Sequence, residues 1–222
     1  MIFDNVLEMA KSVSHFTIAG EGNVSVRDGD AMLIKASGST LESMTDEDLV
    51  RCDLDGNALE GEEKKPSMEV SFHAWILKTF PSINCVCHTH PTNTIKILCS
   101  SRISDFANRR LFPDQVVRNG AKSCVVPYAM PGKPLLEEIK KSVLAFIEEE
   151  GYFPKLILLQ NHGIIVAATS HKECIASTLM CEKSAEIFIG AKTLGQTRFL
   201  SEDEVEEIDK CPSEKRRRMM YQ

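Results

Sequence analysis

Two apolar runs around residue 160 constrain the fold of this chain more than any other feature. KLILL ends at residue 159 and GIIVAA begins at Gly163, so only a short polar segment containing His162 separates them. Apolar runs of this length, bounded by turn residues, are typical of strands that are buried on both faces. We therefore expect two neighbouring strands joined by a tight connection, with His162 at its tip and helices covering the sheet.

Strands and helices are interleaved along the rest of the chain. Further strands are predicted at NVSVR, AMLIKA, LVRCD, SINCVCHTH and SCVVPYA, and Asp28-Gly29 supplies a hairpin turn between the first two. Helical spacing of apolar residues predicts helices over residues 2–14, 67–80, 134–150 and 170–195, and a shorter one through Ile95 and Leu98. Because several strand pairs are joined by tight turns, the pattern favours an α/β protein with a mainly antiparallel sheet.

The ends of three of these helices carry recognisable signals. Gly151 suits the C-cap of the helix over residues 134–150, and Ser170 with Glu173 has the spacing of a capping box. The first turn of the helix over residues 67–80 would hold Ser67 and Glu69. Residues 101–123 and the charged segment after Leu200 are assigned no element or chemistry.

Composition limits the classes of function. The chain has 222 residues, of which 43% are hydrophobic, enough for one full core, and we expect a single domain over residues 1–222. A formal net charge of -6 gives no reason to expect nucleic acid or an anionic membrane as a partner, and the basic run from Lys215 to Arg218 is given no function.

The expected location is the cytoplasm. No long uncharged apolar run occurs, and Asp4 and Glu8 stand where a signal peptide would be basic and then apolar. The 8 cysteines include no C-x-x-C pair, which is typical of reduced thiols in a reducing compartment rather than of a disulfide framework.

The segment CVCHTHP, residues 85 to 91, places two cysteines and two histidines together. Side chains two apart share one face of a strand, so His88 and His90 lie on one face while Cys85 and Cys87 lie on the other. This geometry predicts ligation by histidine alone, with His162 as the best candidate for a third ligand. Three imidazoles leave an open position on zinc, as in catalytic sites. The alternative is that these are ordinary surface or core histidines.

Three other histidines have simpler interpretations. His73 falls one helical turn after Glu69, a spacing more typical of a surface or supporting contact than of a ligand. His15 and His171 lie at predicted helix ends, where exposed capping roles are usual.

With these motifs identified, the chain resembles the class II aldolase/adducin family, and most closely its fuculose-phosphate-type aldolases. The resemblance lies in GNVSVR at 22 to 27, ASGS at 36 to 39, PSMEVSFHAWILKTFPSINCVCHTHP at 66 to 91 and LLQNHGIIV at 158 to 166, with a weaker match in PYAMPGKPLLEE from Pro127. It implies a three-layer sandwich with a central, mainly antiparallel sheet flanked by helices, and commonly a homotetramer with active sites at subunit interfaces.

The resemblance also implies roles for individual residues. His88, His90 and His162 would bind one divalent metal ion, with Zn2+ favoured and Mn2+ or Co2+ as alternatives, and Glu69 would be the acid/base carboxylate that can also occupy the metal. A substrate phosphate would be held by small and hydroxyl residues, namely Gly22, Asn23, Ser37, Gly38 and Ser67. Tyr128 would exchange a proton across a subunit interface. Met68 replaces a common serine, and Lys35-Ala36 replaces a common threonine-proline pair, so the phosphate site departs from the family pattern.

The implied reaction is cleavage of a ketose 1-phosphate to dihydroxyacetone phosphate and an aldehyde through a metal-stabilised enediolate. A ribulose-5-phosphate 4-epimerase, a methylthioribulose-1-phosphate dehydratase or a sugar-acid phosphate decarboxylase are alternatives on the same fold. The epimerases usually carry an aspartate where this chain has Glu69. A non-catalytic, adducin-like interaction module is a further alternative, but it predicts lost metal ligands, whereas all three histidines are present.

Overall fold

The computed structural model describes residues 2–213, so the basic run from Lys215 to Arg218 lies outside the described residues. Its centre is a seven-stranded sheet with the strand order β3-β2-β1-β4-β7-β6-β5. The strands are β1 (Asn23–Asp28), β2 (Ala31–Lys35), β3 (Leu49–Asp53), β4 (Cys85–Thr89), β5 (Cys124–Val126), β6 (Leu156–Leu159) and β7 (Gly163–Ala168). All neighbouring pairs are antiparallel except β5 with β6, which confirms the mainly antiparallel sheet.

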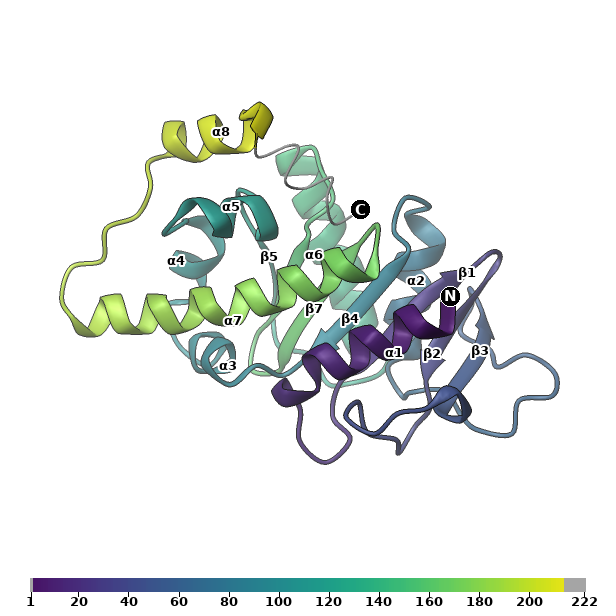
Figure 1. Cartoon of the computed structure of the whole chain (residues 1–222). Helices are drawn as coiled ribbons and strands as arrows, with labels where there is room; N and C mark the ends of the chain where they lie inside the picture. The colour runs from purple at the N-terminus through teal and green to yellow at the C-terminus, as the bar shows by residue number, and fades with distance from the viewer. Residues whose placement is uncertain (1, 214–222) are drawn as a thin grey trace.

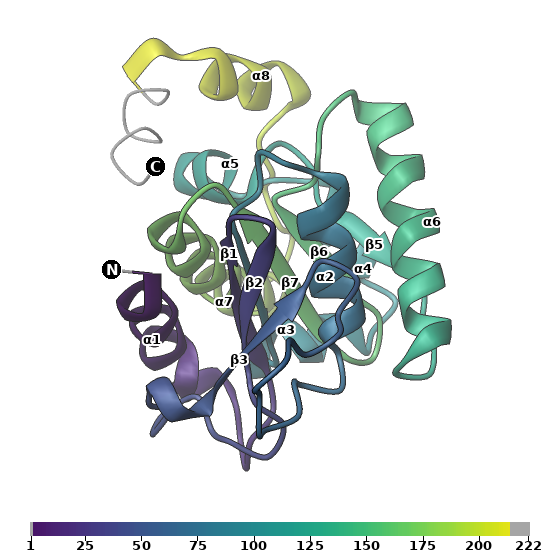
Figure 2. The same ribbon diagram turned by 90° about the vertical axis from the view of Figure 1, so that its right-hand side faces the viewer.

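Helices cover both faces of this sheet (Figures 1 and 2). The α-helices are α1 (Ile2–Val13), α2 (Val70–Thr79), α3 (Thr92–Leu98), α4 (Ile103–Asn108), α5 (Pro113–Asn119), α6 (Lys133–Glu150), α7 (His171–Thr193) and α8 (Glu202–Lys210). Figure 2 shows α1 and α7 on one side of the sheet and α2 and α6 on the other. The expected three-layer sandwich of the α/β class is therefore confirmed.

Two hydrophobic cores lie on opposite sides of the sheet, and β4 contributes to both. Cys85 and Cys87 pack with residues of α1 and α7, whereas Val86 packs with residues of α2 and α6. All three side chains are almost completely buried. The alternation expected along this strand is therefore present, and it puts the cysteines on the opposite face from His88.

Several predicted boundaries need correction. Helix α2 begins at Val70 with Glu69 as its N-cap, so Ser67 precedes the helix and does not belong to its first turn. The reason is that the Ser67 N–H donates to the Lys35 carbonyl at 3.0 Å, next to the Ala36–Pro66 bridge, which ties this residue to the end of β2 before the helix begins. Residues 101–123, which the sequence left without an element, contain the short helices α4 and α5.

Other local predictions are confirmed. Gly151 caps α6 in the left-handed conformation, and the Ser170 hydroxyl accepts the Glu173 N–H at the start of α7, which is one of the two bonds of the expected capping box; the Glu173 carboxylate accepts the Thr169 N–H and hydroxyl. Helices α4, α5 and α8 were not predicted because they are short and lack a sustained apolar period. Among residues 2–213, no helix combines the length and apolar character that a bilayer crossing requires.

Candidate metal centre

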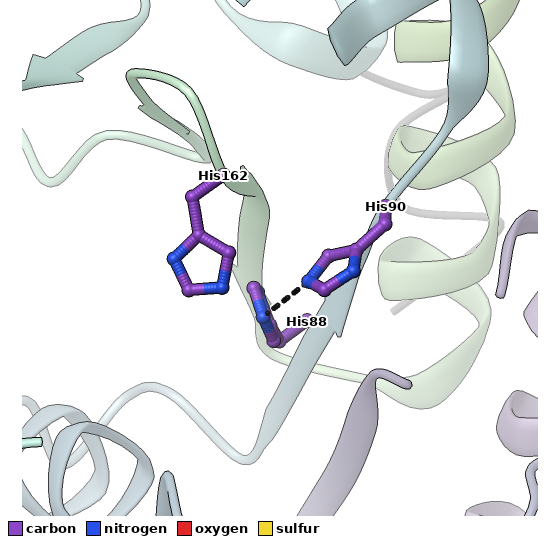
Figure 3. A group of neighbouring side chains, drawn as sticks. All are labelled: His88, His90 and His162. Carbon is purple, nitrogen blue, oxygen red and sulfur yellow. Dashed lines mark hydrogen bonds between the residues drawn. The ribbon is translucent and has the colours of Figure 1, made fainter. Parts of the chain in front are cut away.

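Three histidines from distant parts of the sequence converge at one end of the sheet (Figure 3). His88 lies near the end of β4, His90 follows that strand, and His162 lies in the turn between β6 and β7. Because Thr89 pairs with Ile164 in the β4–β7 ladder, the turn before β7 is held beside the end of β4. One ligand atom from each ring lies within 4.8 Å of the others. The structure thus brings together the three residues that the sequence singled out.

The turn that carries His162 has a specific backbone shape. Asn161 adopts a positive φ of 56°, a conformation that asparagine tolerates better than most residues. The His162 N–H then donates to the Leu159 carbonyl at 3.1 Å, which closes the turn. The imidazole is consequently directed toward the end of β4, as Figure 3 shows.

The ring of His88 is oriented by the backbone. Its Nδ1 lies 2.8 Å from the carbonyl oxygen of Ile164, an acceptor, so Nδ1 carries a proton and Nε2 is the ring nitrogen that would bind a metal ion once it is deprotonated. His90 Nε2 lies 3.0 Å from His88 Nε2. Two nitrogens bound to one tetrahedral zinc ion at 2.0–2.1 Å are roughly 3.3 Å apart. The donor type, tautomer and spacing therefore fit a divalent metal ion.

Two glycines make room for these rings. A Cβ at Gly163 would lie 2.5 Å from His90 Cδ2 and 2.6 Å from the carbonyl oxygen of Thr89. A Cβ at Gly22 would lie 2.8 Å from the carbonyl oxygen of His88. Sequence reasoning did not give Gly163 a role, although its position directly after His162 was the available signal.

Glu69 faces two of the three histidines. Its Oε2 lies 3.2 Å from His88 Nε2, and its Oε1 lies 3.5 Å from His162 Nε2. The side-chain amide of Asn23 donates to Oε2 at 2.9 Å. Burial opposes ionisation of Glu69, but the positive charge and hydrogen bond of His88, together with the Asn23 amide, hold its pKa well below the usual range. The carboxylate is therefore available as a fourth ligand, with an oxygen donor beside the three nitrogens.

A second carboxylate, which sequence reasoning missed, lies beside His90. Glu21 Oε2 is 3.5 Å from His90 Nδ1, and the same oxygen accepts the Ile18 N–H at 3.1 Å. Burial, followed by the proximity of His88 and His162, lowers the pKa of His90 to about 4. Burial likewise lowers the pKa of His162. Near neutral pH both rings are uncharged, with lone pairs free for a metal ion.

The candidate phosphate residues come from three adjacent segments. Asn23 opens β1, the Ser37-Gly38 turn follows β2, and Ser67 lies in the segment that pairs with that turn through an Ala36–Pro66 bridge. The Ser37 N–H donates to the Lys65 carbonyl at 2.9 Å. This backbone pairing brings together two of the predicted loops, whereas the Asn23 amide is engaged with Glu69.

Lys35 carries a buried ammonium group beside these loops. Only 2% of the residue is exposed, and Nζ donates to the carbonyls of Gly20 and Ala36 at 3.3 and 3.4 Å. No carboxylate of the described residues forms an ion pair with it. Burial lowers the pKa of Lys35, although Asp48 and Glu69 oppose this effect. An ammonium group that is buried without a counter-ion favours an anionic ligand nearby.

Tyr128 is not part of this group within one chain. It is 56% exposed, and its hydroxyl donates to Met130 Sδ at 3.4 Å. Met68, next to Ser67, is 87% exposed. Among the described residues, no hydrogen bond or ring contact joins Tyr128 to the three histidines.

Comparison with known proteins is consistent with this geometry. The sequence model of the class II aldolase and adducin N-terminal domain matches residues 7–189. The chain belongs to the class II aldolase and adducin family. Members of this family with the same fold include an L-fuculose 1-phosphate aldolase of known structure, which superimposes with a TM-score of 0.79 at 24% identity and 94% coverage of each chain.

Two curated members of the family illustrate its range of reactions. A 3-oxo-tetronate 4-phosphate decarboxylase from Haemophilus influenzae is 30% identical, with 87% of this chain and 88% of the relative aligned. An L-fuculose phosphate aldolase from Methanocaldococcus jannaschii is 36% identical, with 78% of this chain and 86% of the relative aligned. Both names describe lyases that act on small phosphorylated sugars or sugar acids.

Proposed function

We propose that this protein is a metal-dependent aldolase that cleaves a ketose 1-phosphate to dihydroxyacetone phosphate and an aldehyde. The observation that carries the proposal is the convergence of three imidazoles with a carboxylate that faces two of them. His88, His90 and His162 would hold one divalent ion, with zinc favoured and manganese or cobalt as substitutes, and Glu69 would be a fourth donor. Such an ion, when bound, supplies Lewis-acid stabilisation of negative charge on carbonyl and hydroxyl oxygens.

Glu69 is the proposed acid/base group. Its carboxylate lies at the centre of the site, and it is ionised in the free protein because His88 and Asn23 stabilise the charge. It can therefore exchange the proton at the substrate carbon that carries the negative charge after cleavage. Carbon–carbon bond cleavage leaves its electron pair on the ketone fragment, and the hydroxyl proton of the aldehyde fragment must go to another group. Tyr128 of the partner subunit is proposed for that group, which is consistent with its exposure.

The phosphate is proposed to bind between the Gly22-Asn23 loop and the Ser37-Gly38 turn, next to Ser67. Small residues let backbone N–H groups approach an anion, and hydroxyls complete its hydrogen bonds. Lys35, which replaces a neutral residue common at this position in the family, adds a buried positive charge beside the turn. This charge would offset the hydroxyl lost where Met68 replaces a serine.

Decarboxylation of a 3-oxo sugar-acid phosphate is the second candidate function. The relative from Haemophilus influenzae favours it, and the two reactions make similar demands on the site. Both break a bond to the carbon next to a ketone carbonyl. Both leave the electron pair on that carbon, in the fragment that keeps the ketone and the phosphate. They differ in whether an aldehyde or carbon dioxide leaves, and only the aldehyde requires a group such as Tyr128.

The deciding experiment is product analysis. Metal-loaded protein would be incubated with ketose 1-phosphates, pentulose 5-phosphates and 3-oxo-tetronate 4-phosphates, and triose phosphate, carbon dioxide and epimers would be measured. Triose phosphate released together with an aldehyde supports the aldolase. Triose phosphate released together with carbon dioxide supports the decarboxylase, because loss of the carboxylate from a 3-oxo-tetronate 4-phosphate also leaves a three-carbon ketose phosphate. Epimer formation supports an epimerase. Glu69→Gln should abolish turnover, and a variant that keeps both its metal and full activity would remove Glu69 as the base.

The non-catalytic alternative is tested by metal analysis. Protein purified without chelator should contain about one divalent ion per chain, because three histidine donors are in place. Substoichiometric metal that zinc, manganese and cobalt all fail to restore would favour an adducin-like interaction module. A cytoplasmic homotetramer is the proposed working state, and sedimentation equilibrium would test the assembly.

A further inference from the structure

His73 lies beneath the candidate metal centre and is separated from Glu69 by the Asn23 side chain. It comes from α2, one helical turn after Glu69, and it is completely buried. Its Nδ1 lies 2.7 Å from the Ser25 hydroxyl, and its Nε2 is hydrogen-bonded to Asn23 Oδ1. Asn23 in turn donates to Glu69. A continuous hydrogen-bonded chain therefore leads from Ser25 to the carboxylate that faces His88.

The periodicities of two elements produce this arrangement. Asn23 and Ser25 are two apart on β1 and point to the same face of the sheet, while Glu69 and His73 are four apart at the start of α2. The two pairs interlock, so that His73 contacts both β1 residues and Asn23 contacts both residues of the helix pair.

The hydrogens in this chain have one consistent arrangement. Because the Asn23 amide nitrogen donates to Glu69, its oxygen faces His73, and an oxygen can only accept. His73 Nε2 must therefore carry the proton, which leaves Nδ1 to accept the Ser25 hydroxyl hydrogen. Burial keeps the ring neutral and lowers the pKa of His73 to about 3, a charge state that agrees with this tautomer.

The orientation of the Asn23 amide is the part that the sheet does not determine. Asn23 and His88 are paired in the β1–β4 ladder, so the backbone of Asn23 is fixed beside the metal centre. The amide plane could still rotate by half a turn, which would place its oxygen against the Glu69 carboxylate. The N–H of His73 opposes that rotation, because the rotated amide would bring two donors together.

We propose that His73 is a positioning residue that fixes the Asn23 amide and, through it, the Glu69 carboxylate at the metal centre. The inference rests on the proposed function only for its kinetic consequence, because its effect on metal binding needs no substrate. Groups that orient the ligands of a metal typically change metal affinity or activity about 10- to 100-fold when they are removed.

The alternative is that His73 only fills space in the core. Phe72 and Ile76, two other residues of α2, are almost completely buried and fill the core in this way. The two interpretations differ in whether the effect of His73 depends on Asn23. A packing role is independent of the amide, whereas a positioning role disappears once the amide is gone.

A double-mutant cycle with His73→Leu and Asn23→Ala tests this dependence. Co2+ affinity is measured by titration of the visible absorption band, and kcat and KM are measured separately with whichever substrate class is turned over. His73→Leu should weaken Co2+ binding about 10-fold or more and lower kcat more than it changes KM. In the Asn23→Ala background the same change should have an effect of less than about twofold, because interacting residues are not additive.

Two further variants keep the test decisive. His73→Gln retains an N–H donor and should recover most of the Co2+ affinity, whereas Ile76→Val on the same helix should change stability but not metal binding. If His73→Leu does not fold, Ser25→Ala replaces it in the cycle with Asn23→Ala, because it removes the hydroxyl that His73 Nδ1 accepts; Ser25→Ala is then expected to weaken Co2+ binding, and to do so less once Asn23 is alanine. Equal losses with and without Asn23 would overturn the proposal. Normal coupling in Co2+ binding without turnover on any sugar phosphate would instead reject the proposed function and leave the positioning role intact.

Discussion

Gly163→Ala is the substitution for which the structure gives the clearest expected magnitude. The added methyl group would lie 2.5 Å from His90 Cδ2 and 2.6 Å from the Thr89 carbonyl oxygen, whereas ordinary contacts begin at 3.4 Å. Both neighbours would have to retreat by about 0.8–0.9 Å. Gly163 is not among the residues with positive φ, so alanine can adopt its backbone conformation and the effect is steric.

The two contacts differ in how easily they yield. The His90 ring can rotate, but the Thr89 carbonyl belongs to a buried strand paired with β7 and can move only with the backbone. Overpacking of this kind costs about 1–3 kcal/mol of the free energy of unfolding. A displaced His90 can no longer keep a metal–nitrogen distance of about 2.0–2.1 Å, so we expect zinc affinity to fall about 10- to 100-fold.

The assay combines urea denaturation of the apoprotein with competition titration of zinc. Gly190→Ala is the matched control, because Gly190 lies inside α7 and a Cβ there would meet nothing within 4 Å. That control should gain up to about 1 kcal/mol from helix propensity and leave zinc affinity unchanged. Wild-type stability and wild-type zinc affinity in Gly163→Ala would refute the placement of His90 against β7.

Three further predictions concern groups around the site and in the core. Glu21→Gln should weaken zinc binding by less than about 10-fold in the competition titration, because the carboxylate beside His90 is half exposed and strongly solvated. A loss of zinc affinity as large as that measured for Glu69→Gln would contradict this. Replacing Cys85 and Cys87 by alanine should leave the metal content, measured by atomic absorption, unchanged. Both thiols face away from the histidines, and burial raises their pKa to about 12. Loss of metal from this variant would show that the cysteines are ligands. Glu173→Gln should cost about 1–3 kcal/mol of the free energy of unfolding in urea at pH 7, because Lys155 at 2.6 Å and Thr169 hold the pKa of Glu173 below its ordinary 4.5 despite burial. A carboxyl with a depressed folded pKa stabilises above its unfolded pKa, so this difference should shrink as pH falls below about 4.5, and a difference that grows there would show that the sign is wrong.

The proposed assembly also makes a prediction about Tyr128, because its exposed hydroxyl would act in a neighbouring active site. Tyr128→Phe and Glu69→Gln should each be inactive alone as an aldolase, whereas mixed oligomers of the two should recover part of the activity. Recovery arises because some interfaces then combine an intact Tyr128 with an intact Glu69. Mixed oligomers without any activity would remove Tyr128 from the neighbouring site.

The sequence by itself determined the strands and the longer helices, and the strand face on which His88 and the two cysteines lie. The apolar runs on either side of Asn161 and His162 predicted β6 and β7, and alternation along CVCHTHP separated the histidines from the cysteines. These features are local, because strand periodicity and turn chemistry depend on residues close together in the chain. The same locality explains why Ser67 was misplaced: it is held outside the helix by a backbone hydrogen bond to Lys35, far away in the sequence.

Only the tertiary structure decided how the groups meet. Strand order places the end of β4 between β1 and β7, which brings Asn23 and His162 to the same end of the sheet as His88. The proton on His88 Nδ1 is set by the Ile164 carbonyl, and the space for His90 depends on a glycine that pairs with Leu159. His73 had the spacing of a supporting contact, but its partners on β1 could not be identified until the helix was packed on the sheet. Hydrogen-bond direction and close contact depend on atoms brought together by folding, and for that reason no periodicity in the sequence encodes them.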